Sequence, residues 1–235
     1  MRFAREAFAL TLFATVYICV AADASAQVPE TTAHAVTVSH IDPTKIPRGV
    51  ERFELGGSGA ADLTFMIADS VKNGRQVVWY RSEGRTASGV ASTVGWFDAR
   101  TGRTLFERYL GPDGSVEAAG DATYSAPQRL PIDSGTITDV QLPLVLASLP
   151  LQDAAIYRVK VQAVRPYAAN AEWVEVAVHL DPATSANPDS VSMWRIECKK
   201  GVVATTYLLA VSDRRLLAKQ MMMFDGNTVE LRRMP

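Results

Sequence analysis

The sequence has little cysteine, little histidine and almost no net charge. Its 235 residues include two cysteines and three histidines, and the formal net charge is -1. A chain so close to neutral gives no reason to expect nucleic acid or an anionic membrane surface as a partner. Three histidines supply few metal ligands or catalytic bases, so we expect no metal and no cofactor.

Motifs that carry known catalytic chemistry are also missing. The chain has no Gly-x-Ser-x-Gly elbow, no phosphate-binding loop and no His-Glu-x-x-His pair. His34 and His40 form a poor metal site without a third ligand, and we interpret them as solvated loop residues. His179 and Glu175 share one strand face, where such a pair is usually solvated. We therefore rank catalysis third, behind ligand binding and contact with a partner protein.

The only long apolar run lies at the N-terminus. Arg2 and Arg5 precede an apolar segment at residues 8–22, and Ala24-Ser25-Ala26 follows it. This order is typical of a signal peptide, residues 1–26, cleaved after Ala26. The run is shorter than the roughly 20 residues that span a bilayer. We therefore expect a periplasmic or secreted protein that is not membrane-spanning.

Cleavage at that point would leave Cys198 as the remaining cysteine, so no intramolecular disulfide could form. Lys199 and Lys200 beside it would favour a reactive thiolate. The alternation of the strand, however, places Cys198 on the same face as Trp194 and Ile196. We interpret it as a buried structural cysteine.

After the signal, residues 27–59 are predicted to form an extended arm, because Pro29, Pro43 and Pro47 disfavour a helix. A strand is expected within this arm near residues 35–39. The remaining residues, 60–235, are predicted to form a single antiparallel β domain.

Short runs of alternating apolar and polar residues dominate this domain. Residues 156–163 place Tyr157, Val159, Val161 and Ala163 on one face. Residues 172–180 place Val174, Val176, Val178 and Leu180 together, and we assign to the opposite face Glu172, Trp173, Glu175, Ala177 and His179. One apolar, buried face and one polar, solvent-exposed face are typical of antiparallel sheets.

Turn signals and one helix complete the fold prediction. Hairpins are expected at residues 72–74, 98–102 and 111–114. A short helix is expected between Asp139, as its N-cap, and Pro150, with Leu142, Val145 and Leu146 on its apolar side. The fold class is mainly β: a curled antiparallel sheet or open, half β-barrel of about ten strands with one short helix packed against it.

The run Met221-Met222-Met223 suggests a soft-metal site, since thioethers bind copper(I). On a strand, however, Met221 and Met223 point one way and Met222 the other, so three sulfurs do not converge. We interpret them as adaptable core or pocket residues. If the sheet encloses a cavity, its candidate lining residues are Trp194, Ile196, Tyr207, Met221 and Met223.

Several segments also resemble a family of exported bacterial β proteins of unknown function. They are LPLVLASLPL at residues 142–151, YRV at 157–159, MWRIE at 193–197, TYL at 206–208 and SDRRLLAK at 212–219. The resemblance covers the C-terminal half and, more faintly, residues 77–110, and this chain departs from it in long connections at 165–171 and 182–189. It implies a curled sheet similar to the periplasmic lipoprotein-carrier fold, and it carries no catalytic residues.

Two functional hypotheses follow. The first is a non-enzymatic exported protein that binds a hydrophobic or lipid-like molecule inside the curled sheet. The second is a structural or interaction module of the cell envelope that contacts a protein partner through its sheet surface or edge. The first hypothesis requires the sheet to enclose more volume than its own side chains fill, and the second does not.

Overall fold

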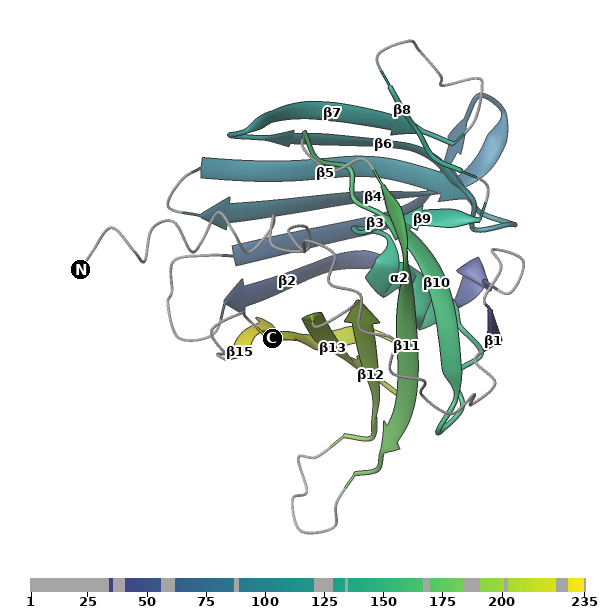
Figure 1. Ribbon diagram of the computed structural model, residues 1–235, viewed down its shortest axis with the longest axis vertical. Helices are drawn as coiled ribbons and strands as arrows, with labels where there is room; N and C mark the ends of the chain where they lie inside the picture. Colours follow the sequence, from purple (N-terminus) through teal and green to yellow (C-terminus); the bar gives the residue numbers. More distant parts are fainter. Residues whose placement is uncertain are drawn as a thin grey trace, which may run out of the picture.

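A computed structural model gives the architecture of the chain (Figure 1). It describes residues 34–35, 41–55, 62–86, 89–120, 129–133, 135–166, 170–183, 191–200, 203–222 and 228–234. The predicted signal peptide lies outside these residues. Fifteen strands of the described part form one sheet, in the order β1-β10-β11-β12-β13-β14-β15-β2-β3-β4-β5-β6-β7-β8, and β9 also pairs with β10.

The sheet is a meander in two halves that meet at the pairing of β15 with β2. The first half contains β2 (Gly49–Leu55), β3 (Asp62–Lys72), β4 (Arg75–Thr86), β5 (Gly89–Asp98), β6 (Thr104–Gly111), β7 (Gly114–Ala119) and β8 (Leu130–Pro131). The second contains β10 (Ile156–Gln162), β11 (Ala171–Asp181), β12 (Met193–Lys200), β13 (Val203–Ala210), β14 (Leu216–Met222) and β15 (Thr228–Arg233), with β1 (His34–Ala35) and β9 (Thr136–Thr138) beside β10.

The predicted fold class is confirmed: an open, curled, mainly antiparallel sheet packs around one short α-helix, α2 (Leu142–Ser148). The predicted number of about ten strands is wrong. The additional strands include β1, β8 and β9, which have two or three residues each and join their neighbours in parallel. Such short strands exist only through partners distant in sequence, so no local alternation marks them.

Hairpin connections lie where the turn residues predict them. Between β3 and β4, Asn73 has a φ of 52° and Gly74 a φ of 74°. Two consecutive residues with positive φ make the turn whose twist matches the strands, and asparagine followed by glycine adopts it at low cost. The turns at residues 99–101 and 112–113 connect β5 to β6 and β6 to β7.

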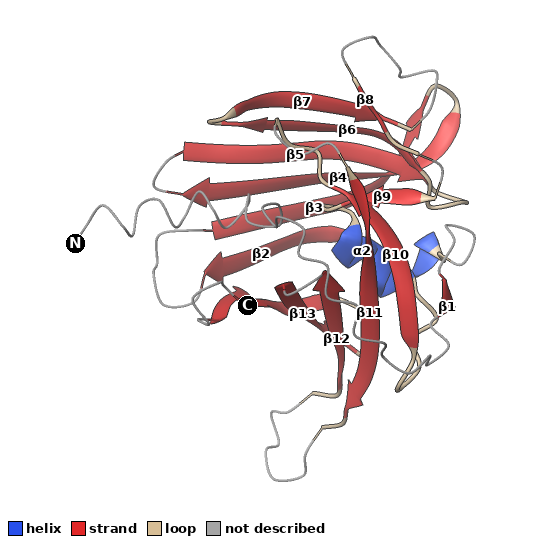
Figure 2. Cartoon of the chain, viewed as in Figure 1, coloured by secondary structure: helices blue, strands red, loops and turns tan. Residues whose placement is uncertain are grey.

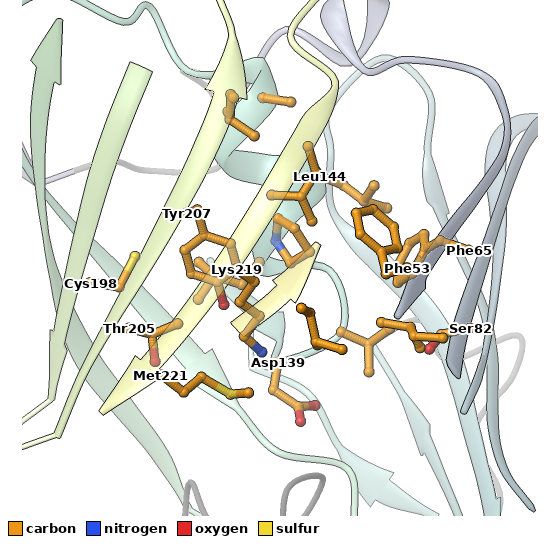
Figure 3. A pocket seen from close by; sticks show the side chains of 18 of the residues that line it. Phe53, Phe65, Ser82, Asp139, Leu144, Cys198, Thr205, Tyr207, Lys219 and Met221 are labelled. Atoms are coloured by element: carbon orange, nitrogen blue, oxygen red, sulfur yellow. The ribbon is translucent and has the colours of Figure 1, made fainter. Parts of the chain in front are cut away.

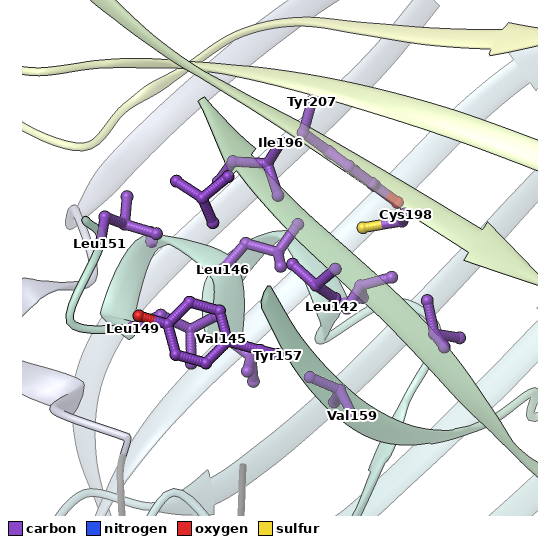
Figure 4. Packing of buried hydrophobic residues seen from close by; sticks show 14 of the residues in the cluster. Leu142, Val145, Leu146, Leu149, Leu151, Tyr157, Val159, Ile196, Cys198 and Tyr207 are labelled. Atoms are coloured by element: carbon purple, nitrogen blue, oxygen red, sulfur yellow. The ribbon is translucent and has the colours of Figure 1, made fainter. Parts of the chain in front are cut away.

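The helix α2 packs against both halves of the sheet, between which it lies (Figure 2). Leu142, Val145 and Leu146 belong to a hydrophobic cluster with β10 to β13 (Figure 4). Leu144 belongs to a second cluster with residues of β2 to β5. The predicted apolar side is therefore buried, but the predicted cap is wrong: Gln141 is the N-cap residue and makes no side-chain cap bond.

The structure also revises the predicted arm at residues 27–59. Its last part is β2, which pairs with β15 on one side and β3 on the other, and which buries Glu51 and Phe53. Pro43 begins a short 3-10 helix, η2 (Pro43–Lys45), because proline is tolerated in a first helical turn and Asp42 accepts a hydrogen bond from the Thr44 amide at 3.1 Å. The strand predicted near residues 35–39 is seen at His34–Ala35, and residues 36–40 lie outside the described part.

Candidate functional site

A cavity of about 180 Å³ lies between α2 and the concave face of the sheet (Figure 3). Its apolar wall comes from α2, from β2 and β3, and from β13 to β15. The main apolar lining residues are Phe53, Leu55, Leu63, Phe65, Ile67, Leu142, Leu144, Ala147, Leu209, Leu216, Met221 and Leu231. On β2 and β3 the apolar lining residues alternate along the strand, as inward-facing side chains do.

The length of the helix explains why this space exists. With seven residues, α2 is about 10 Å long. The strand β3 has eleven residues and is therefore about 36 Å long. The helix fills one part of the concave face with leucine side chains and leaves another part of it uncovered.

The structure brings two of the predicted lining residues together. Tyr207 and Met221 both line the cavity, from β13 and β14. Ile196 is fully buried in the cluster beneath α2, and Trp194 packs against that cluster; neither is among the residues that line the cavity. Met223 lies outside the described residues. Met222 is 54% exposed, so Met221 and Met222 point to opposite faces, as their alternation predicts.

Cys198 also lines the cavity and is buried, in agreement with the prediction from its strand face. Burial raises the pKa of its thiol to about 12. At neutral pH the thiol is therefore protonated, and a protonated thiol is a poor nucleophile.

Charged side chains at the cavity are mostly paired. The guanidinium of Arg165, 5% exposed, contacts the Asp139 carboxylate at 3.1 Å and lies 4.5 Å from the centre of the Tyr109 ring. Asp139 therefore serves this tertiary ion pair instead of capping α2. Lys200 contacts Glu172 at 2.8 Å. Glu172 shares the inner face with Val174, because their positions differ by two, so its assignment to the opposite face is wrong.

Lys219 differs from these cations. Its side chain extends from β14 into the cavity, with the ammonium 5.5 Å from the centre of the Tyr207 ring. None of the ion pairs among the described residues includes Lys219, and the Asp139 carboxylate pairs with Arg165. Burial lowers the pKa of Lys219, and the negative charge of Asp139 acts in the opposite direction.

Next to the cavity, a buried polar network fixes the start of α2 to the sheet. Glu107 on β6 accepts hydrogen bonds from the hydroxyls of Tyr80 and Thr138. Gln141 accepts hydrogen bonds from the Thr104 hydroxyl and from the Thr138 amide, the latter at 3.1 Å. These bonds join β4, β6 and β9 to the N-terminus of the helix.

Glu107 makes this network sensitive to pH. Burial, reinforced by the charge of Asp139, raises the pKa of Glu107 from 4.5 to about 7. The folded protein thus holds a proton that the unfolded chain loses above pH 4.5. The contribution of this group to stability is complete below pH 4.5, and it is lost as the pH rises from there through 7.

We expect Glu107→Gln to remove this part of the pH dependence, because glutamine stays neutral while its carbonyl still accepts both hydrogen bonds. Urea unfolding at pH 5 and pH 8 measures the effect. Glu175→Gln is the matched control, since Glu175 is exposed on β11. An E107Q variant whose stability falls between the two pH values as steeply as that of the wild type would contradict this assignment.

The described residues contain no cluster of three or more potential metal ligands. Within the same residues, no helix is long and apolar enough to cross a membrane.

No protein-family model, curated protein or solved structure matches the chain. The resemblance to exported bacterial β proteins therefore stays a prediction.

Sequence reasoning missed the roles of Glu107, Asp139, Arg165 and Lys219. Two of them, Lys219 and Glu107, could have been found from the alternation of apolar and polar residues along their strands. Lys219 is two positions from Met221, and Glu107 is two positions from Leu105 and Tyr109, so each lies on an otherwise apolar face. Asp139 and Arg165 offered no such signal, because their pairing depends on the path of β10 between them.

Proposed function

We propose that the protein is exported to the periplasm or secreted, and that it binds the apolar part of a lipid-like molecule without catalysing a reaction. The observation that carries this proposal is the apolar cavity of about 180 Å³ that α2 leaves uncovered on the concave face. Apolar cavities of this kind take up apolar ligands, because dry apolar walls bind water poorly.

The size of the cavity limits the ligand. An engineered cavity of about 150 Å³ binds one benzene molecule. A space of about 180 Å³ therefore holds a short segment of one acyl chain, or a single ring, and excludes a whole diacyl lipid. Each buried CH2 group contributes about 0.8 kcal/mol, so about six buried carbons give roughly 5 kcal/mol and a sub-millimolar dissociation constant.

The chemistry of the walls favours binding over catalysis. The thiol of Cys198 is protonated, and most charged side chains at the cavity are in ion pairs. The N-terminal signal pattern supports export.

Isothermal titration of the purified protein with 1-octanol tests the proposal. We expect sub-millimolar binding to the wild type. Leu55→Trp, which fills the cavity from β2, should weaken binding at least about 10-fold, since tryptophan occupies the space that the chain needs. Val50→Trp is the control, because Val50 lies on the same strand and is 55% exposed.

If the wild type does not bind 1-octanol at any concentration up to the solubility limit of the alcohol, the proposal is contradicted. Equal weakening by the two tryptophan variants would also contradict it, since octanol would then bind outside the cavity. Either result would favour the alternative function, contact with a protein partner of the cell envelope.

A further inference from the structure

The ammonium group of Lys219 lies in a cavity whose walls are mostly apolar. It projects from the inner face of β14 toward the middle of the cavity, between Tyr207 and Asp139 (Figure 3). Met221, two residues later, supplies an apolar neighbour on the same face.

The other cations that line the cavity have partners. Arg165 contacts Asp139 at 3.1 Å, and Lys200 contacts Glu172 at 2.8 Å. Arg214 donates hydrogen bonds to the carbonyl oxygens of Ala147 and Leu149, the latter at 3.0 Å. Lys219 is the lining cation that has no such hydrogen bond or ion pair among the described residues, and the carboxylate whose charge acts on it, that of Asp139, is already paired with Arg165.

A cation held in apolar surroundings without a counter-ion is costly, and an anion placed beside it removes much of that cost. The same cost lowers the pKa of Lys219, because burial disfavours the charged form of the amine. A ligand that brings an anionic group to this point would therefore gain affinity that a neutral ligand of the same shape lacks.

We propose that the cavity ligand is a single-chain alkyl carboxylate, whose chain lies against the apolar wall and whose carboxylate pairs with the Lys219 ammonium. This inference rests on the proposed function and specifies its ligand. One lysine without an ion pair matches one negative charge, whereas a phosphate monoester carries about 1.5 to 2. A volume of about 180 Å³ matches one chain segment.

The test compares three ligands of equal chain length, octanoate, 1-octanol and octylammonium, by isothermal titration at pH 7. The wild type should bind octanoate about 10–100-fold more tightly than 1-octanol, the range expected for a charge-assisted hydrogen bond. Octylammonium should bind most weakly, because its charge repels that of Lys219.

Lys219→Met keeps an unbranched side chain, shorter by one heavy atom, and removes its charge. We expect this variant to bind octanoate about 10–100-fold more weakly than the wild type does, with 1-octanol binding retained. Lys199→Met is the control, since Lys199 lies on the other face of β12 with its side chain 55% exposed. It should bind all three ligands as the wild type does.

The outcomes separate the two proposals. If the wild type binds octanoate and 1-octanol equally, or if K219M keeps the preference for octanoate, the carboxylate assignment is wrong while the apolar cavity function stands. If the wild type binds neither ligand, the proposed function itself fails. The comparison of ligands on the wild type needs no variant, so it decides the question even if K219M does not fold.

Discussion

Replacing Leu146 with alanine should destabilise the protein by about 3 kcal/mol or more. Leu146 is fully buried at the centre of α2 and packs in the cluster with β10 to β13 (Figure 4). The variant would lose the transfer free energy of the removed carbons and would leave a void that a rigid sheet closes only in part. Urea unfolding of the variant and the wild type measures the difference.

Leu110→Ala is the matched control, because Leu110 is 53% exposed on β6. This change should alter the free energy of unfolding by no more than about 0.5 kcal/mol. If the two leucine variants lost similar stability, α2 would not be the element on which the second half of the sheet packs.

Gly95→Ala should have a comparably large effect, about 3 kcal/mol, from added volume. Gly95 on β5 lies directly opposite Tyr80 on one side and Glu107 on the other. A Cβ at this position would overlap the Tyr80 hydroxyl and would lie 2.6 Å from Tyr80 Cζ and 2.8 Å from the Phe106 carbonyl oxygen. Tyr80 is fully buried and donates to Glu107, so neither ring nor backbone can yield cheaply.

A double-mutant cycle with Tyr80→Ala identifies the cause of that loss. Once the ring is removed, Gly95→Ala should cost at least about 1 kcal/mol less than it does in the wild type. If the cost of Gly95→Ala were the same in both backgrounds, the contact with Tyr80 would not explain why glycine is required there.

Much of the fold could be predicted because the order of apolar and polar residues along a β-strand shows which of its faces is buried. Along β10, Tyr157, Val159 and Val161 are buried and Arg158 is exposed, as their alternation predicts. Asn73-Gly74 encodes its turn through local backbone preference. Both signals are short-range, so a single sequence contains them.

Features that depend on distant partners were not predictable in the same way. Asp139 satisfies the local rule for a helix cap, but Arg165 is a stronger partner once β10 brings it close, and Gln141 takes the cap position. The cavity has the same origin. Residues such as Met221 look alike in a filled core and in a cavity wall, and the difference lies in how far α2 reaches across the sheet.

Two methionine side chains of β14 report directly on whether the cavity admits an apolar chain. Met221 lines the cavity, and the adjacent Met222 is exposed on the opposite face. In a protein labelled with ¹³C at its methionine methyl groups, we would titrate 1-octanol and follow both signals by NMR, assigning them with Met221→Leu and Met222→Leu. We expect a saturable shift of the Met221 methyl signal while the Met222 signal stays in place. A Met221 signal that does not move at saturating octanol, or a Met222 signal that moves as far, would contradict binding in the cavity.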